Sequence, residues 1–126
     1  MTNLISLVAR ILLALIFVLA GIGKLGAGYA ATQAYMQSAG VSSTLLPLVI
    51  ALEIGGGLAL VVGLFARWAA LALAGFALIS AALFHHNFAD QTQMVMFLKN
   101  LAMAGGLLLV FVHGAGGISI DAKRGA

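Results

Sequence analysis

The chain has 126 residues, of which 63% are hydrophobic and 7% are charged, and its mean hydropathy is +1.18. This composition excludes an ordinary soluble domain and predicts an integral membrane protein. The formal net charge of +3 gives no support to nucleic-acid binding, and the absence of cysteine excludes disulfides, thiol relays and thiolate metal sites.

Four apolar segments are each long enough to cross a membrane as a helix. A spanning helix needs about 20 mostly apolar residues, because the hydrocarbon core is roughly 30 Å thick. The segments cover residues 4–23, 45–63, 68–88 and about 94–113. They are rich in Leu and Ala and apolar on all sides, whereas β-barrel strands would alternate. The sequence therefore predicts one all-α membrane domain over residues 1–126, built as an antiparallel bundle of four transmembrane helices.

The first span has a cation at each end of one helical face. Three further spans follow it, so we expect it to be retained as a helix and not removed as a secretion signal. At 100° per residue, one stripe contains Arg10, Ala14, Phe17, Gly21 and Lys24. This stripe is expected to face the bundle.

The first outer loop and the second span carry three local signals. Residues 29–38 predict a short amphipathic helix along the outer interface, with Gly28 and Gly40 at its ends. Pro47 lies in the first turn of the second helix, where it breaks no helical hydrogen bond. Glu53 is the single acidic residue of residues 45–63. A carboxylate inside a membrane is costly and needs a partner or a function.

Small residues in the second and third spans predict close helix packing. Gly55, Ala59 and Gly63 recur every four residues, and alanines recur similarly in the third span. Gly56 and Gly57 flank the face that carries Glu53, and we expect them to make room for a neighbouring helix or a ligand head group.

The basic residues predict the orientation of the chain. Residues 65–67 form a tight turn, so the second and third helices are antiparallel neighbours. With four spans, both termini lie on one side, which we expect to be the cytoplasm because that side has more basic residues. The expected cytoplasmic-side anchors are Arg10, Arg67, Lys123 and Arg124. The other side carries Lys24 and Lys99, partly offset by Asp90.

Polar residues from all four spans are predicted to meet in the outer half of the bundle. The third span ends with two histidines and the fourth begins with polar groups, which gives the cluster Lys24, Glu53, His85, His86, Lys99 and Asn100. The cluster could be purely structural, with Glu53 tied to Lys24, Lys99 or Asn100, or with the lysines snorkelling to the interface. No metal site is expected, because adjacent histidines of a helix point about 100° apart and His113 belongs to the opposite side.

Several motifs in this order resemble those of the DoxX family of bacterial inner-membrane proteins. The resemblance runs from Arg10 to Asp121 and rests on Ala9-Arg10-Ile11-Leu12, Ala20-Gly21-Ile22-Gly23-Lys24, Leu52-Glu53-Ile54-Gly55-Gly56-Gly57, Gly63-Leu64-Phe65-Ala66-Arg67, Phe84-His85-His86-Asn87-Phe88, Phe97-Leu98-Lys99-Asn100-Leu101, Gly114-Ala115-Gly116 and Ser119-Ile120-Asp121. It implies a four-helix domain related to the small membrane subunits of thiosulfate:quinone oxidoreductases, often described as a quinol oxidase subunit. Ser42 departs from the family's usual proline, which affects the local loop.

Three function classes follow for this expected inner-membrane protein. In the first, it is a membrane subunit of a redox complex that binds quinone: His85 or His86 and Asn100 donate to the quinone carbonyls, and Glu53 exchanges protons. No catalytic residue and no tightly bound cofactor is assigned, so electrons would come from a redox or soluble protein partner. The second class is a structural or assembly protein. The third is a small permease or proton pathway through Glu53, which would need a homo-oligomer for room.

Overall fold

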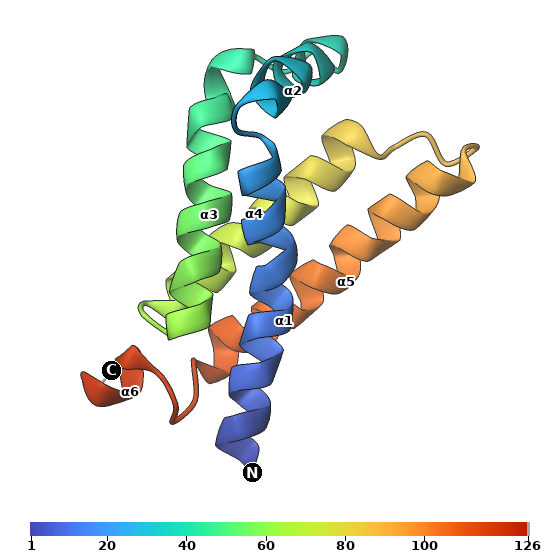
Figure 1. The fold of residues 1–126 in the computed structure, drawn as a ribbon. Helices are drawn as coiled ribbons and strands as arrows, with labels where there is room; N and C mark the ends of the chain where they lie inside the picture. Colours follow the sequence, from blue (N-terminus) through green and yellow to red (C-terminus); the bar gives the residue numbers. More distant parts are fainter. Residues whose placement is uncertain (126) are drawn as a thin grey trace.

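The computed structural model describes residues 1–125, and most of them are helical (Figure 1). The elements are α1 (Thr2–Gly23), α2 (Ala27–Ser38), the 3-10 turn η1 (Ser43–Leu45), α3 (Leu46–Val62), α4 (Ala66–Phe84), α5 (Gln91–His113) and the short α6 (Ile120–Lys123). Four stretches are long and apolar enough to cross a membrane: Thr2–Gly23, Ser43–Val62, Ala66–Phe84 and Gln91–His113. The predicted all-α protein with four membrane-spanning helices is confirmed.

The third span ends at Phe84 instead of at residue 88, so the predicted boundary is wrong. His85 leaves helical geometry, with φ −128° and ψ 48°, and its Nδ1 lies 3.2 Å from Oε1 of Gln93. The next helix begins at Gln91, where the side chain of Asp90 accepts a hydrogen bond of 2.9 Å from the Thr92 backbone N–H. The paired histidines therefore lie in the connection between α4 and α5.

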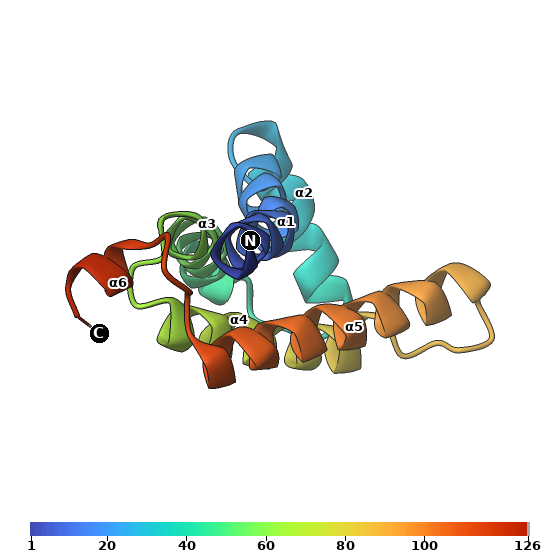
Figure 2. The same cartoon turned by 90° about the horizontal axis from the view of Figure 1, so that it is seen from below.

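The spans associate as two helix pairs. Helix α1 packs along α3, and α4 packs along α5. Figure 1 shows the second pair inclined to the first, and Figure 2, in which α1 and α3 are seen nearly end-on, shows α4 and α5 side by side along one side of that pair. The predicted inward stripe of α1 is buried at Arg10, Ala14, Phe17 and Gly21. The alanine stripe of α4 is buried at Ala70, Ala74, Ala77 and Ala81.

The glycines in and at the end of α3 differ in whether a side chain at their position would be crowded or strained. A Cβ on Gly57 would lie 2.5 Å from Cγ2 of Val18 in α1, and one on Gly56 would lie 3.1 Å from Cγ of Leu73 in α4. Gly63 ends α3 with a φ of +73°, which favours glycine. Gly55 faces open space, with no neighbouring atom within 4 Å of its Cβ position. Its expected packing role therefore has no contact within the described chain.

Arg10 is a buried structural residue, so its assignment as a cytoplasmic-side anchor is wrong. Its side chain is 1% exposed. Nη1 donates to the backbone oxygens of Leu60, at 2.7 Å, and Val61, at 3.2 Å, and Nη2 donates to the oxygen of Ile118. The guanidinium thus satisfies carbonyls at the C-terminal end of α3, where a positive charge is favoured. Arg67, Lys123 and Arg124 are exposed, as expected of anchors.

The segment after α5 closes the turn between α3 and α4. The two carboxylate oxygens of Asp121 accept hydrogen bonds from the backbone N–H groups of Phe65, at 2.7 Å, and Ala66, at 2.8 Å. The Asp121 N–H donates to the oxygen of Gly63 at 2.9 Å. A carboxylate at the N-terminus of α4 is favoured by the helix dipole. This contact stabilises Phe65 in its left-handed conformation, with φ +48°.

Glycine 57 provides a test of the α1–α3 contact. We expect Gly57→Leu to be less stable than Gly55→Leu by about 1–3 kcal/mol, the usual cost of overpacking a close contact. The two variants gain the same helix propensity, so their difference reports the contact of residue 57 with Val18 and Ala14 of α1. The measurement is detergent-induced unfolding followed by circular dichroism. Equal stabilities for the two variants would contradict the observed packing.

Candidate functional site

A cavity of about 240 Å³ lies between the two helix pairs, at the end of the bundle where α2 is found. Most of its wall is apolar and includes Ile16, Phe17, Val49, Phe76 and Met103. Its polar lining consists of Lys24, Tyr35, Glu53, Ser80, His85, Lys99 and Asn100. An apolar cavity with a few convergent polar groups has the usual character of a small-molecule site.

Glu53 is paired with Lys24, which selects one of the three partners that the sequence left open. Nζ of Lys24 lies 2.8 Å from Oε1 of Glu53, and it also donates to the backbone oxygen of Ala20 at 3.3 Å. Glu53 is 3% exposed. Lys24 compensates the charge of this carboxylate, and no other described residue donates to Oε1. Glu53 thus has a single partner at the cavity wall.

Asn100 and Lys99 bring the beginning of α5 to the same cavity. Nδ2 of Asn100 donates to the backbone oxygen of Ala77 at 3.1 Å, which fixes the buried amide against α4. Lys99 is half-buried, and the single ion pair among residues 1–125 is that of Lys24 with Glu53. The cavity therefore holds one compensated charge pair and one further cation.

The structure separates the two histidines that the sequence treated as equivalent. His85 lines the cavity, and its Nδ1 contacts the amide oxygen of Gln93. Because an amide oxygen only accepts, Nδ1 is the donor in this contact, and in the neutral ring Nε2 is then an acceptor. His86 is exposed and lines a different hollow beside Asp90 and Gln93. Among the described residues, no three His, Cys, Asp or Glu side chains are close enough to hold a metal ion.

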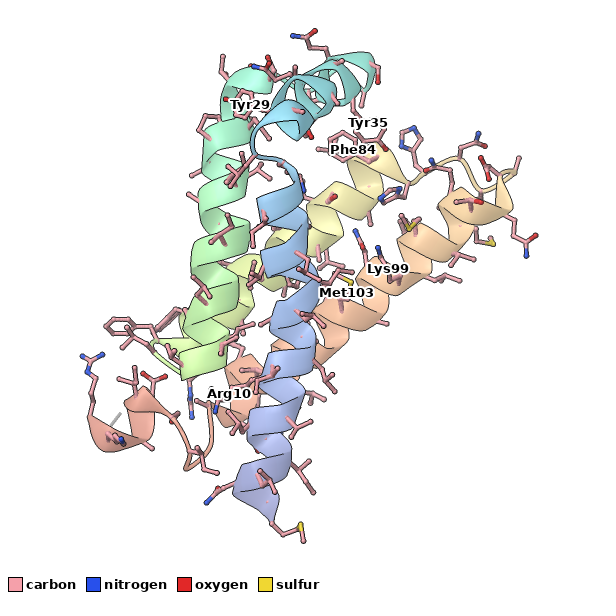
Figure 3. The ribbon with its side chains drawn as sticks, viewed as in Figure 1. Arg10, Tyr29, Tyr35, Phe84, Lys99 and Met103 are labelled. Carbon is pink, nitrogen blue, oxygen red and sulfur yellow. The ribbon has the colours of Figure 1, made fainter. Side chains whose placement is uncertain are left out.

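Helix α2 contributes residues that the sequence reasoning did not assign to the site. Met36 is buried and lines the cavity, together with Tyr35. The ring of Tyr35 stacks on that of Phe84, with centroids 5.1 Å apart and planes at 22°. Figure 3 shows this contact between α2 and the end of α4, and also shows Lys99 and Met103 on α5. The amphipathic pattern of residues 29–38 predicted this helix at the end of the bundle, but the pattern alone did not show that Tyr35 and Met36 line the cavity.

The cavity can position a small ring and exchange protons with it. Phe17, Phe76 and Met103 offer apolar surface, whereas Glu53 and His85 offer a carboxylate and an imidazole at the wall. Both groups act as general acids and bases in proteins. The site therefore has the properties expected of a binding site for a mostly apolar molecule that carries oxygen atoms.

Comparison with known proteins gives a consistent family assignment. The family model described as DoxX matches residues 5–86. The chain is 53% identical over 115 residues to "Inner membrane protein YqjF" of Escherichia coli (strain K12), covering 91% of this chain and 88% of the relative. It is 34% identical over 125 residues to "Inner membrane protein YphA" of the same organism, covering 93% and 88%. No solved structure matches. The chain belongs to the DoxX family of membrane proteins.

Proposed function

We propose that this protein is an inner-membrane subunit of a redox complex and that it binds a quinone in the cavity beside Glu53. The observation that carries the proposal is the buried Glu53–Lys24 pair at the wall of a largely apolar cavity. Intramembrane carboxylates of this kind most often mark a substrate or proton site. Both relatives are named as inner membrane proteins, which supports the same location for this chain.

The proposed quinone ring lies among the apolar side chains, and its oxygens face the polar groups. Lys99 and Lys24 supply N–H donors for a quinone carbonyl, while Glu53 and His85 supply acceptors for the hydroxyl groups of the reduced form. Reduction of a quinone to a quinol takes up two electrons and two protons. Glu53 and His85 would pass these protons at the cavity wall.

The electrons are assigned to a partner protein. The sequence contains no cysteine and no haem or flavin motif, so the proposed role is that of a quinone-binding subunit. With both termini in the cytoplasm, as the basic residues favour, the cavity would lie in the outer leaflet.

A structural role is the second candidate, and it rests on particular contacts. Lys24 joins α1 to Glu53 of α3, and Asn100 joins α5 to the backbone of α4. Each of these bonds links two helices, as expected if the polar cluster serves to fix helix register. This role predicts loss of stability in variants of the cluster, without any bound quinone in the unmodified protein.

Glu53→Gln tests the proposed quinone site. A short-chain ubiquinol, kept reduced under anaerobic conditions, is titrated by calorimetry into the full chain in nanodiscs, because Glu53 is proposed to accept from the hydroxyl groups of the reduced form. We expect the substitution to weaken binding about tenfold or more, because hydrogen bonds to charged groups contribute about 1.5–3 kcal/mol. Asp90→Asn is the matched control, since it makes the same chemical change at the same end of the bundle but outside this cavity. A folded wild-type protein that binds no quinone would refute the proposal.

The neighbouring histidines provide an internal comparison. We expect His85→Gln to weaken quinone binding about threefold to tenfold, the effect of losing one ordinary hydrogen bond. His86→Gln is expected to leave binding unchanged, because His86 is exposed and lies outside the cavity. The same titration measures both variants. Equal losses in the two variants, or a loss confined to His86→Gln, would place the quinone elsewhere.

A further inference from the structure

A second and larger cavity, of about 690 Å³, lies between the first half of α1 and the last half of α5. The two helices touch where Leu13 meets Gly106, since a Cβ on Gly106 would lie 3.1 Å from Cδ2 of Leu13. The helices diverge on both sides of this contact (Figure 1). The quinone cavity proposed above lies on one side of it, and the second cavity, here called the α1–α5 groove, lies on the other.

The α1–α5 groove changes from apolar to polar along its length. Leu12 and Leu13 of α1 face Leu109 and Val110 of α5 in its apolar part. Its polar rim, at the beginning of α1 and the end of α5, contains Thr2, Asn3, Ser6 and His113. Asn3 is positioned there because its Oδ1 accepts a hydrogen bond of 3.1 Å from the Gly117 backbone N–H, which leaves its Nδ2 as a donor. This order of surfaces matches a molecule with an acyl chain and a polar head group.

The charges at this end of the bundle favour an anionic head group. Four of the six basic residues, Arg10, Arg67, Lys123 and Arg124, lie at this end with one acidic residue, Asp121. That leaves three positive charges, which is the whole formal net charge of the chain. At the opposite end, two lysines are balanced by Glu53 and Asp90.

Arg10 adds a buried charge to the wall of the groove. It lines the groove, its hydrogen-bond acceptors are all neutral backbone oxygens, and its Nε has no partner among the described residues. Asp121, whose carboxylate accepts from the backbone N–H groups of Phe65 and Ala66, offsets part of this charge at a distance. A cation in these surroundings is screened weakly and attracts an anion at the rim.

We propose that the α1–α5 groove binds one anionic phospholipid. Its acyl chain lies between Leu12 and Leu109, and its phosphate lies at the rim beside Asn3 and His113, attracted by Arg10. Basic pockets between transmembrane helices are known to bind anionic head groups. A zwitterionic lipid fills the apolar part equally well, but its head group lacks the net negative charge that this end attracts. The proposal does not depend on quinone binding at the opposite end.

Native mass spectrometry of the full chain tests the proposal. The detergent-purified protein is mixed with equal amounts of phosphatidylglycerol and phosphatidylcholine that carry identical acyl chains. We expect one retained phosphatidylglycerol in about fivefold excess over phosphatidylcholine, the preference given by about one basic group near an anionic surface. High salt and His113→Ala are both expected to reduce this preference. Equal retention of the two lipids would overturn the proposal.

Variants that fill the groove separate this site from lipid bound elsewhere. Leu109→Trp and Leu12→Trp enlarge exposed side chains on opposite walls, so each is expected to reduce lipid retention while the helices stay intact. Leu58→Trp is the matched control, because Leu58 is equally an exposed leucine of a spanning helix but lies outside the groove. Thermal unfolding in detergent verifies that the variants are folded. Wild-type retention in both groove variants, or an equal loss in Leu58→Trp, would show that the lipid binds elsewhere.

Discussion

The buried guanidinium of Arg10 joins three parts of the chain that are distant in sequence. It lies in α1, donates to the last carbonyls of α3 through Leu60 and Val61, and reaches the segment after α5 through Ile118. These carbonyls lie at the C-terminal end of α3 and in the segment after α5, and a carbonyl left unsatisfied in an apolar environment costs several kcal/mol. A buried charge is also costly unless it is hydrogen-bonded. The same contacts therefore satisfy both the backbone carbonyls and the guanidinium of Arg10. The α1–α3 pair and the closing segment depend on this contact for their relative positions.

The two helix pairs differ in how tightly they pack internally and against each other. Within the first pair, Gly21 and Gly57 let the backbones of α1 and α3 approach closely, and within the second pair Asn100 of α5 donates to the backbone oxygen of Ala77 in the buried alanine stripe of α4. Between the pairs, α1 meets α5 near Leu13 and Gly106 and then diverges from it. This crossing of α1 and α5 accounts for both cavities, because two inclined helices move apart on each side of their contact and leave space between them. The shape of both sites is therefore set in part by small residues, of which Ala77 also lines the first cavity and Gly106 the second.

The sequence predicted the properties that depend on periodicity and composition. The four spans, the inward face of α1 and the small-residue stripe of α4 all follow from local patterns, and all are present. The partner of Glu53 was reduced to three candidates, and the choice of Lys24 required the angle at which α1 crosses α3. Arg10 was misassigned because its position within a span does not reveal that carbonyls of α3 and of the C-terminal segment lie within its reach.

The remaining differences have equally local causes. His85 and His86 are adjacent in sequence, and a helix was expected to continue through both, but α4 ends before them and only His85 turns towards the cavity. The helical period placed Gly55 on a packing stripe, yet the neighbouring helices lie on the sides of Gly56 and Gly57. Such outcomes depend on which faces meet after folding, and a single-helix pattern does not contain that information.

The contact between Asp121 and the N-terminus of α4 also affects the order in which contacts form during synthesis. Phe65 and Ala66 emerge from the ribosome more than fifty residues before the carboxylate that accepts their hydrogen bonds. Until Asp121 has been made, the strained turn after α3 has to rely on water or lipid head groups for those backbone donors. The first helix pair has all of its own packing surfaces much earlier. The contact that closes the turn after α3 therefore forms only once the segment that follows α5 has been made.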